Sequence, residues 1–259
     1  MSDSPVFFEA AGSIAVITLN RPENRNSMNA EVLPAFQEAM DQVRAHKGLR
    51  CLIITGSGKS FCAGMDFYAA FPEDGALPNQ VFEQIYKPFL AVADLPFPVI
   101  GALNGHAIGG GFGLAMMCDI RVAALEGRYG ANFVRLGIHS GMAVSYVLPR
   151  LVGLSKANEL LFTGRLFDGA EALEMGWASY ALPREEVLPK ARELAREIAM
   201  SAPVAVQMMK RSIYKGLDWK AREAAEWEAH CQSRTFEMED AKEGVAALLE
   251  KRPPDFKGR

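Results

Sequence analysis

The sequence has few cysteines, little excess charge and no long hydrophobic run, and each of these absences excludes a class of protein. Its four cysteines, Cys51, Cys62, Cys118 and Cys231, include no CxxC pair, so neither a zinc ribbon nor a disulfide framework is expected. With 28 Lys and Arg against 31 Asp and Glu, the chain has no basic excess with which to bind nucleic acid or an anionic membrane. No apolar segment reaches the length that spans a membrane.

Several well-known motifs are also absent. The first five residues lack the basic and apolar regions of a secretory signal, and together with the isolated cysteines this predicts a reducing cytoplasm. Gly58-Lys59-Ser60 lacks the earlier glycine of a phosphate-binding P-loop, because Ile53 stands there. Residues 109–113 lack the last glycine of a dinucleotide fingerprint, which is replaced by Leu114. No GxSxG or HExxH is present, so we expect neither a serine hydrolase elbow nor a metal site.

An alternation of strand and helix patterns fills the first two-thirds of the chain. A turn at residues 11–13 between two apolar segments predicts a hairpin, and the unbroken apolar run 51–55 predicts a strand covered on both faces. Strand, glycine loop and helix patterns then repeat as far as residue 182. We therefore expect an α/β fold with mainly parallel strands, built as a spiral core over residues 1–182.

Helical patterns alone occupy residues 183–259, which we expect to form a region docked on the core. The apolar residues of this region include Met209, Ile213 and Trp219. They are more than a short appendage would expose to water, so we expect the chain to assemble into trimers or hexamers.

Two glycine-rich loops are built alike. Ala63-Gly64-Met65-Asp66 and Ile108-Gly109-Gly110-Gly111 each follow a predicted strand and lead toward a helix. Backbone N–H groups at such turns are unpaired, and two that converge form an oxyanion hole. The alternative is that the glycines only permit tight turns and close packing, and composition alone favours that alternative.

The residues around these loops resemble a known family. FCAGMDF at 61–67 and NGHAIGGGFGLAMMCD at 104–119 are similar to the crotonase superfamily of enoyl-CoA hydratases and isomerases. The resemblance runs from LNRPENRNSM at 19–28, through LFTGR at 161–165, to EGVAALLEKR at 243–252. It implies a spiral of ββα units whose C-terminal helices form homotrimers or dimers of trimers. It also implies an acyl-CoA substrate, with coenzyme A as part of that substrate and no covalently bound cofactor.

The resemblance implies roles for individual residues. The backbone N–H groups of Met65 and Gly110 would hold the thioester oxygen while an enolate develops. Lys251 would reach the coenzyme A phosphates from an adjacent subunit, and Arg25 would lie near them. The residues implied to contact coenzyme A are Arg25, Ala63, Gly64, Asp66 and Lys251.

Two positions depart from the family pattern. Hydratases of this family carry glutamates where Gly113 and Phe133 stand here, and neither residue can activate water or deliver a proton. His139 and Ser140 are the candidates to replace them, since an imidazole titrates near neutrality and a hydroxyl can relay a proton or hold a substrate carboxylate. The simpler alternative is that His139 faces another subunit and Ser140 caps its own turn.

Three functions stay open at this point. The leading hypothesis is an enoyl-CoA hydratase/isomerase-like enzyme that forms a stabilised enolate. The others are a decarboxylase or thioester hydrolase of the same type, and a non-catalytic subunit that binds acyl-CoA. We expect a hydrophobic acyl group and slow hydration of crotonyl-CoA. Hydration should rise when Gly113→Glu is combined with Phe133→Glu, provided that the added charges do not disturb the packing.

Overall fold

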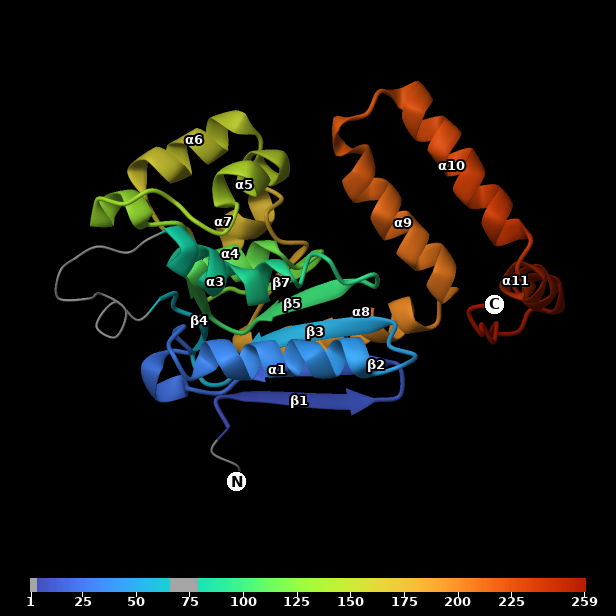
Figure 1. Cartoon of the computed structure of the whole chain (residues 1–259), viewed down its shortest axis with the longest axis horizontal. Coiled ribbons are helices and arrows are strands. Elements are labelled where there is room, and N and C mark those ends of the chain that lie inside the picture. Colours follow the sequence, from blue (N-terminus) through green and yellow to red (C-terminus); the bar gives the residue numbers. More distant parts are fainter. Residues whose placement is uncertain (1–3, 66–78) are drawn as a thin grey trace.

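The centre of the fold is a sheet of six strands in the order β1-β2-β3-β5-β7-β9 (Figure 1). The computed structural model describes residues 4–65 and 79–259. Strands β1 and β2 form the predicted antiparallel hairpin, and all later neighbours are parallel. The strands are Val6–Ala11 (β1), Ile14–Leu19 (β2), Cys51–Gly56 (β3), Val99–Leu103 (β5), Ile120–Ala124 (β7) and Tyr180–Leu182 (β9).

A second, smaller sheet continues from the carboxyl ends of the long strands. It consists of β4 (Ser60–Cys62), β6 (His106–Ile108) and β8 (Tyr129–Gly130), all paired in parallel. β4 follows β3 after a short turn, and β6 follows β5 after two residues. Because parallel strands end at the same edge of a sheet, the glycine loops that follow β4 and β6 emerge side by side.

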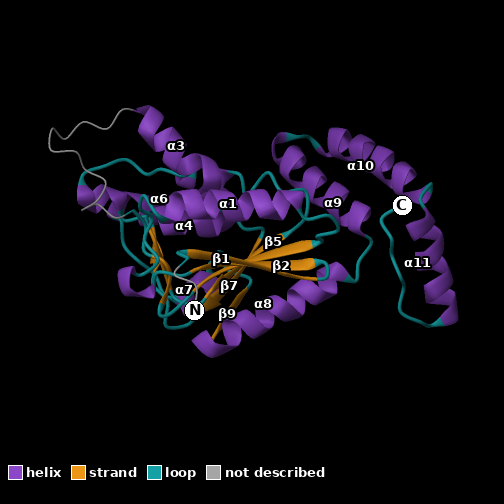
Figure 2. Cartoon of the chain, turned by 60° about the horizontal axis from the view of Figure 1, so that its bottom comes forward, coloured by secondary structure: helices purple, strands orange, loops and turns teal. Residues whose placement is uncertain are grey.

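Helices cover both faces of the large sheet, with α8 on one face and α1 and α4 on the other (Figure 2). Val187, Ala191 and Ala195 are spaced four residues apart along α8, and all three are fully buried against the sheet. Such spacing places them on one helical face. The helices before the C-terminal region are Val32–Ala45 (α1), Asn79–Leu90 (α3), Gly110–Met116 (α4), Val144–Val152 (α5), Leu154–Thr163 (α6), Gly169–Glu174 (α7) and Arg184–Ala199 (α8). Within residues 4–65 and 79–259, no helix is long and apolar enough to cross a membrane.

Helix α1 forms where its sequence pattern predicts. The Oδ1 atom of Asn29 accepts hydrogen bonds from the N–H groups of Glu31 and Val32, at 3.0 and 2.9 Å, and so caps the first turn. Phe36 and Met40, one turn apart, are completely buried in the core beneath the helix. The cap and the apolar stripe together fix both the start of the helix and the face that it buries.

The last three helices form an arm beside this core (Figure 1). They are Pro203–Lys215 (α9), Ala221–Phe236 (α10) and Glu239–Glu250 (α11). Lys210 of α9 is only 8% exposed, and its Nζ lies 2.8 Å from the Oδ2 of Asp119 and 3.0 Å from the carbonyl oxygen of Phe97. The hydroxyl of Tyr214 donates a third hydrogen bond to Asp119 Oδ1 at 2.7 Å. The Lys210–Asp119 pair and the Tyr214 hydrogen bond tie the arm to the amino ends of β5 and β7, the end of the sheet opposite to the glycine loops.

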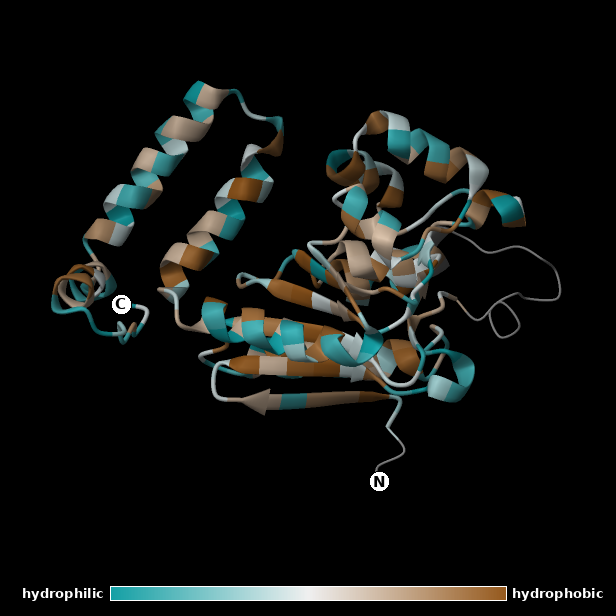
Figure 3. Cartoon of the chain, turned by 180° about the vertical axis from the view of Figure 1, so that it is seen from behind, coloured by the Kyte–Doolittle hydropathy of each residue, from teal (hydrophilic) through white to brown (hydrophobic). Residues whose placement is uncertain are grey.

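The arm also carries large apolar side chains that a single chain leaves exposed. In Figure 3, hydrophobic and hydrophilic residues alternate along its helices. Exposed fractions reach 77% at Leu248 and Leu249. The other strongly exposed apolar residues of the arm are Met209, Ile213, Phe236 and Val245.

Candidate active site

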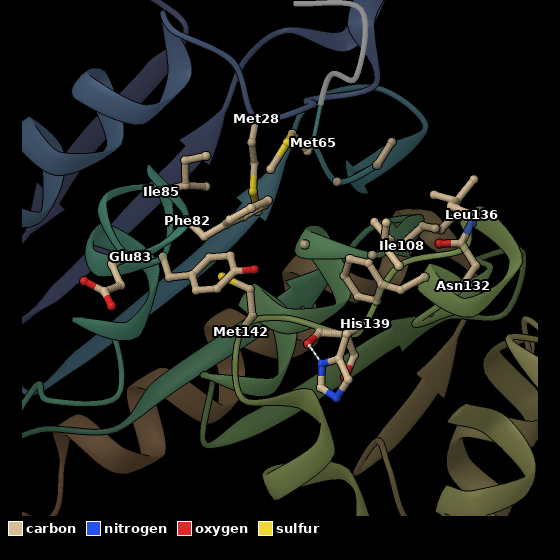
Figure 4. A pocket seen from close by; sticks show the side chains of 18 residues that line it. Met28, Met65, Phe82, Glu83, Ile85, Ile108, Asn132, Leu136, His139 and Met142 are labelled. Carbon is tan, nitrogen blue, oxygen red and sulfur yellow. Dashed lines mark hydrogen bonds between the residues drawn. The ribbon is translucent and has the colours of Figure 1, made fainter. Parts of the chain in front are cut away.

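A cavity of about 670 Å³ opens where the two glycine loops meet (Figure 4). Met28 and Met65 lie on one side of it, Phe82 and Ile85 of α3 on a second, and His139 lies across from the two methionines. The cavity brings together six of the nine residues predicted for the site. They are Ala63, Gly64, Met65, Gly110, His139 and Ser140.

The backbones of the two loops touch at this cavity. A Cβ atom built on Gly64 would lie 3.3 Å from the nitrogen of Gly110 and 2.7 Å from the carbonyl oxygen of Ile108. Gly64 also has φ +91°, a conformation that favours glycine. The loops therefore approach as closely as they do because position 64 has no side chain.

Met65 and Gly110, the residues predicted to supply the two donors, both line this cavity. Gly110 is the first residue of α4, so its N–H has no preceding carbonyl within the helix. Met65 follows Gly64 directly and forms an isolated β-bridge with Met28. In this bridge the Met28 N–H donates to the Gly64 carbonyl oxygen at 2.7 Å, so the bond does not use the Met65 N–H. Among the described residues, no acceptor takes the N–H of Met65 or of Gly110.

Two predicted residues, Arg25 and Lys251, are not among the residues that line the cavity. Arg25 is exposed, and its carbonyl oxygen accepts a hydrogen bond from the Ala63 N–H of the first loop at 3.0 Å. Lys251 is exposed at the end of α11, so a single chain holds it on the arm and away from the cavity (Figure 1). Asp66 lies outside the described residues.

His139 and Ser140 both line the cavity but do not form a nucleophile and base pair. The Nδ1 atom of His139 lies 2.6 Å from the carbonyl oxygen of Ser140. A carbonyl only accepts, so Nδ1 carries the proton and Nε2 is the nitrogen left for other partners. The serine hydroxyl takes no part in this contact, which removes the arrangement that activates a serine nucleophile.

The side chain of Met142 occupies the space next to Gly113, at one corner of the cavity. A Cβ atom on Gly113 would overlap the Cβ of Met142 and lie 2.9 Å from its Cγ. Met142 is itself only 1% exposed, so it has little room in which to move away. The gain of hydration expected for Gly113→Glu with Phe133→Glu requires that the packing stay undisturbed, and a glutamate at 113 would collide with Met142.

Phe133 makes the neighbouring wall apolar. It begins a short 3-10 helix, Phe133–Leu136, and its ring atoms lie 3.8 Å from the position of a Cβ on Gly109. An aromatic ring therefore covers the second glycine loop on the cavity side. Among the described residues, nine large apolar side chains line the cavity, which are Met28, Met65, Phe82, Ile85, Ile108, Phe133, Leu136, Ile138 and Met142.

Two polar residues of α3 line the cavity and were not predicted from the sequence. The hydroxyl of Tyr86 packs against Gly141, where an added Cβ would overlap it. Burial raises the pKa of Tyr86, so its hydroxyl stays protonated at neutral pH and can donate a hydrogen bond. Glu83 is the one carboxylate among the described residues that line the cavity, and Figure 4 shows it directed away from the centre. The three- and four-residue spacing of Ile85 and Tyr86 from Phe82 could have placed Tyr86 on the same face.

Other titratable groups near the loops have structural roles. His106 accepts a hydrogen bond from the Arg128 N–H at Nδ1, at 3.0 Å. Burial, and after it the positive charges of Arg184, Arg25 and Arg128, lower the pKa of His106, so its imidazole is neutral at pH 7. The thiol of Cys62 lies directly before the first loop, but burial raises its pKa to about 12 and makes it unreactive.

Comparison with known proteins gives a consistent result over the whole chain. A family model described as enoyl-CoA hydratase/isomerase matches residues 9–259. Short-chain-enoyl-CoA hydratase of Clostridium acetobutylicum is 35% identical over 257 residues, which is 98% of each chain. Crotonyl-CoA hydratase of Syntrophomonas wolfei is 36% identical over 259 residues, which is 99% of each chain. The crystal structure of an enoyl-CoA hydratase from Bacillus anthracis superimposes with a TM-score of 0.92 at 33% identity, covering 98% of this chain and 100% of that one. The predicted α/β fold is thereby confirmed.

Proposed function

Because the chain belongs to the enoyl-CoA hydratase/isomerase family and is an enzyme of that family, we propose that the cavity between its glycine loops binds the acyl group of an acyl-CoA thioester. The thioester oxygen accepts hydrogen bonds from the N–H groups of Met65 and Gly110. The close approach of Gly64 to the nitrogen of Gly110 supports this proposal, since Met65 and Gly110 line one cavity and neither N–H has an acceptor among the described residues. Backbone donors of this kind stabilise the negative charge of an enolate without exchanging protons themselves.

The proposal extends to coenzyme A and to the acyl group. Arg25 and the first loop bind the nucleotide end, and Lys251 reaches it from a neighbouring copy. Coenzyme A is then part of the substrate, and the enzyme holds no covalent cofactor. The nine apolar side chains around the cavity support an apolar acyl group, because each methylene that leaves water is worth about 0.8 kcal/mol.

Hydration of a short enoyl thioester is expected to be slow. Loss of one carboxylate acid or base lowers a rate by about 10²–10⁴, and here both positions hold residues without acid–base groups. Calorimetry with acetyl-, crotonyl- and octanoyl-CoA measures binding, and loss of the crotonyl-CoA absorbance measures hydration. We expect heat of binding with little hydration. The absence of heat with all three at millimolar concentration would remove the acyl-CoA proposal.

Matched variants test which residues limit hydration. Gly113→Glu with Phe133→Glu is expected to gain no hydration and to lose stability, because of the collision with Met142. Adding Met142→Gly removes the side chain that fills the corner, and glycine suits the φ of +58° at this residue. We expect hydration to rise only in the triple variant. Rapid hydration by the wild type would instead show that other groups, such as His139 or Tyr86, supply the acid and base.

A second candidate reaction is favoured by the filled corner at Gly113. In the decarboxylation of a carboxyacyl-CoA, the electrons of the breaking carbon–carbon bond form the enolate and carbon dioxide leaves. No base is needed for this step, and the same two N–H groups stabilise the product anion. Release of carbon dioxide from malonyl-CoA or methylmalonyl-CoA, in the absence of crotonyl-CoA hydration, distinguishes this candidate from the first.

We also propose that the exposed apolar residues of α9–α11 are covered by other copies of the chain, in a homotrimer or a dimer of trimers. Side chains as exposed as Leu248 and Leu249 are costly to leave in water, and their burial is the main favourable term in such assembly. Sedimentation velocity is expected to give a trimer or hexamer at micromolar concentration. A stable monomer there would contradict the proposal.

A further inference from the structure

Asn26 holds the turn between β3 and β4 from one side. It is completely buried, and its Nδ2 donates to the carbonyl oxygens of Ser57 and Ser60, at 2.9 and 2.7 Å. Its Oδ1 accepts the Arg21 N–H at 2.8 Å. Asn26 also has φ +54°, a conformation that asparagine and aspartate tolerate better than most residues. All three of these hydrogen bonds of the Asn26 amide go to backbone atoms, one at nearby Arg21 and two in the distant turn before β4.

Asn104 holds the same turn from the other side. It follows β5 directly, is 9% exposed, and accepts the Gly56 N–H at its Oδ1, at 3.0 Å. Its Nδ2 donates to the carbonyl oxygens of Gly58 and Ser60, at 3.0 and 3.4 Å. The carbonyl of Ser60 is thus the common acceptor of both asparagines.

Ser60 is the first residue of β4, and the strand has only three residues before the first glycine loop begins at Ala63. The segment that contains Asn26 is also hydrogen-bonded to this loop. The Arg25 carbonyl accepts the Ala63 N–H, and the Met28 N–H donates to the Gly64 carbonyl. The backbone from Ser60 to Gly64 is therefore held at both ends, directly before Met65.

The pairing of β4 with β6 does not fix the position of the loops by itself. Ser60 pairs with His106 and Cys62 with Ala107, so two steps along β4 match one step along β6. Such a bulge in a three-residue ladder specifies register weakly. Asn104 stands two residues before β6 and bonds to the first residue of β4, and so it ties the starts of both strands together.

We propose that Asn26 and Asn104 are positioning residues for the oxyanion hole. Their amides set the register of β4 against β6, and this register sets the distance between the N–H of Met65 at the end of one strand and the N–H of Gly110 at the end of the other. The inference rests on the proposed function of these two donors. It gives a role to two residues of the NRNSM and NGH segments that do not line the cavity.

Conservative variants and a spectroscopic probe test this role. Asn26→Asp and Asn104→Asp keep the size of the side chain and its accepting oxygen, but place a second oxygen against the Ser60 carbonyl. The probe is 2,4-hexadienoyl-CoA, whose conjugated thioester absorbs at longer wavelength when its carbonyl oxygen is polarised. We expect the wild type to shift this absorbance and each variant to lose most of the shift. Where turnover is measurable, kcat is expected to fall about 10²-fold, as misplacement of reacting groups by 1 Å can cause.

Three controls separate positioning from general destabilisation. Coenzyme A without an acyl group should bind each variant as tightly as it binds the wild type, since it lacks the thioester oxygen. Lys210→Met destabilises the chain from the opposite end of β5 and should keep the full shift. If the aspartate variants fail to fold, Asn104→Ala and Asn26→Ser replace them in the same measurements, because they add no charge.

The outcomes are distinguishable. Folded asparagine variants that retain the wild-type shift and kcat would overturn the positioning role and leave the proposed function intact. A wild type that binds 2,4-hexadienoyl-CoA without any shift would overturn the oxyanion hole itself, and the positioning role with it.

Discussion

Gly110→Pro is expected to lower turnover of the acyl-CoA substrate by about 10²–10³-fold, the usual effect of removing one donor from an oxyanion hole. Proline has no N–H, and the structure places Gly110 at a position that otherwise accepts proline. It is the first residue of α4, where the missing N–H costs no helical hydrogen bond. The preceding Gly109 has ψ −119°, outside the α-helical region that proline disfavours in its neighbour.

Gly110→Ala is the matched control. A Cβ at this position would lie 3.1 Å from the Sδ of Met28, so alanine and proline both push on the same flexible thioether, while alanine alone keeps the N–H. Kinetics of both variants should be read beside circular dichroism and coenzyme A binding. If the two variants fold, bind and turn over substrate alike, Gly110 is only a packing residue.

Lys210→Met is expected to lower the free energy of unfolding by about 3 kcal/mol, at the lower end of the range for breaking a buried ion pair. The change leaves the Asp119 carboxylate, whose side chain is only 15% exposed, without its cation. The loss of stability is expected at the lower end of that range because the Tyr214 hydroxyl and the Val99 N–H still donate hydrogen bonds to Asp119. Urea unfolding followed by circular dichroism measures the difference.

Lys156→Met provides the surface comparison. Its Nζ lies 2.7 Å from a carboxylate oxygen of Glu159, but both side chains are 41% exposed, and such pairs contribute about 0–1 kcal/mol. Equal losses in the two methionine variants would show that burial of the Lys210 pair adds nothing to its contribution.

Much of the fold could be predicted because its signals are local. The apolar stripe of α1 and its Asn29 cap lie within a few turns of each other, and the completely buried run of β3 marks a strand covered on both faces. The helices from residue 184 onward also follow their apolar spacing. The division of the chain at residues 182 and 183 into a core and an oligomer-forming region stays a prediction.

The candidate site could be predicted only where a loop carries its own pattern. Glycines at 64 and 109–111 mark the two loops, but nothing near Gly113 in the sequence indicates that Met142 fills the space beside it. The bonds of Asn104 to the turn before β4, and the pairing of Lys210 with Asp119, join residues 44–48 and 91 positions apart. Contacts of this kind depend on how strands and helices pack after the chain has folded, which periodicity does not encode.

The strand order of the large sheet has a consequence for synthesis on the ribosome. Because β1, β2, β3, β5, β7 and β9 lie in the sheet in the order in which they occur in the chain, each new strand can join the edge left by the previous one as it emerges. One face of the sheet stays uncovered until α8 is made, because α8, which covers Val16, Ile53 and Ile100, follows the last strand in the chain. A nascent chain that stalls before residue 184 therefore presents a bare apolar sheet face, the form of the protein most in need of a chaperone.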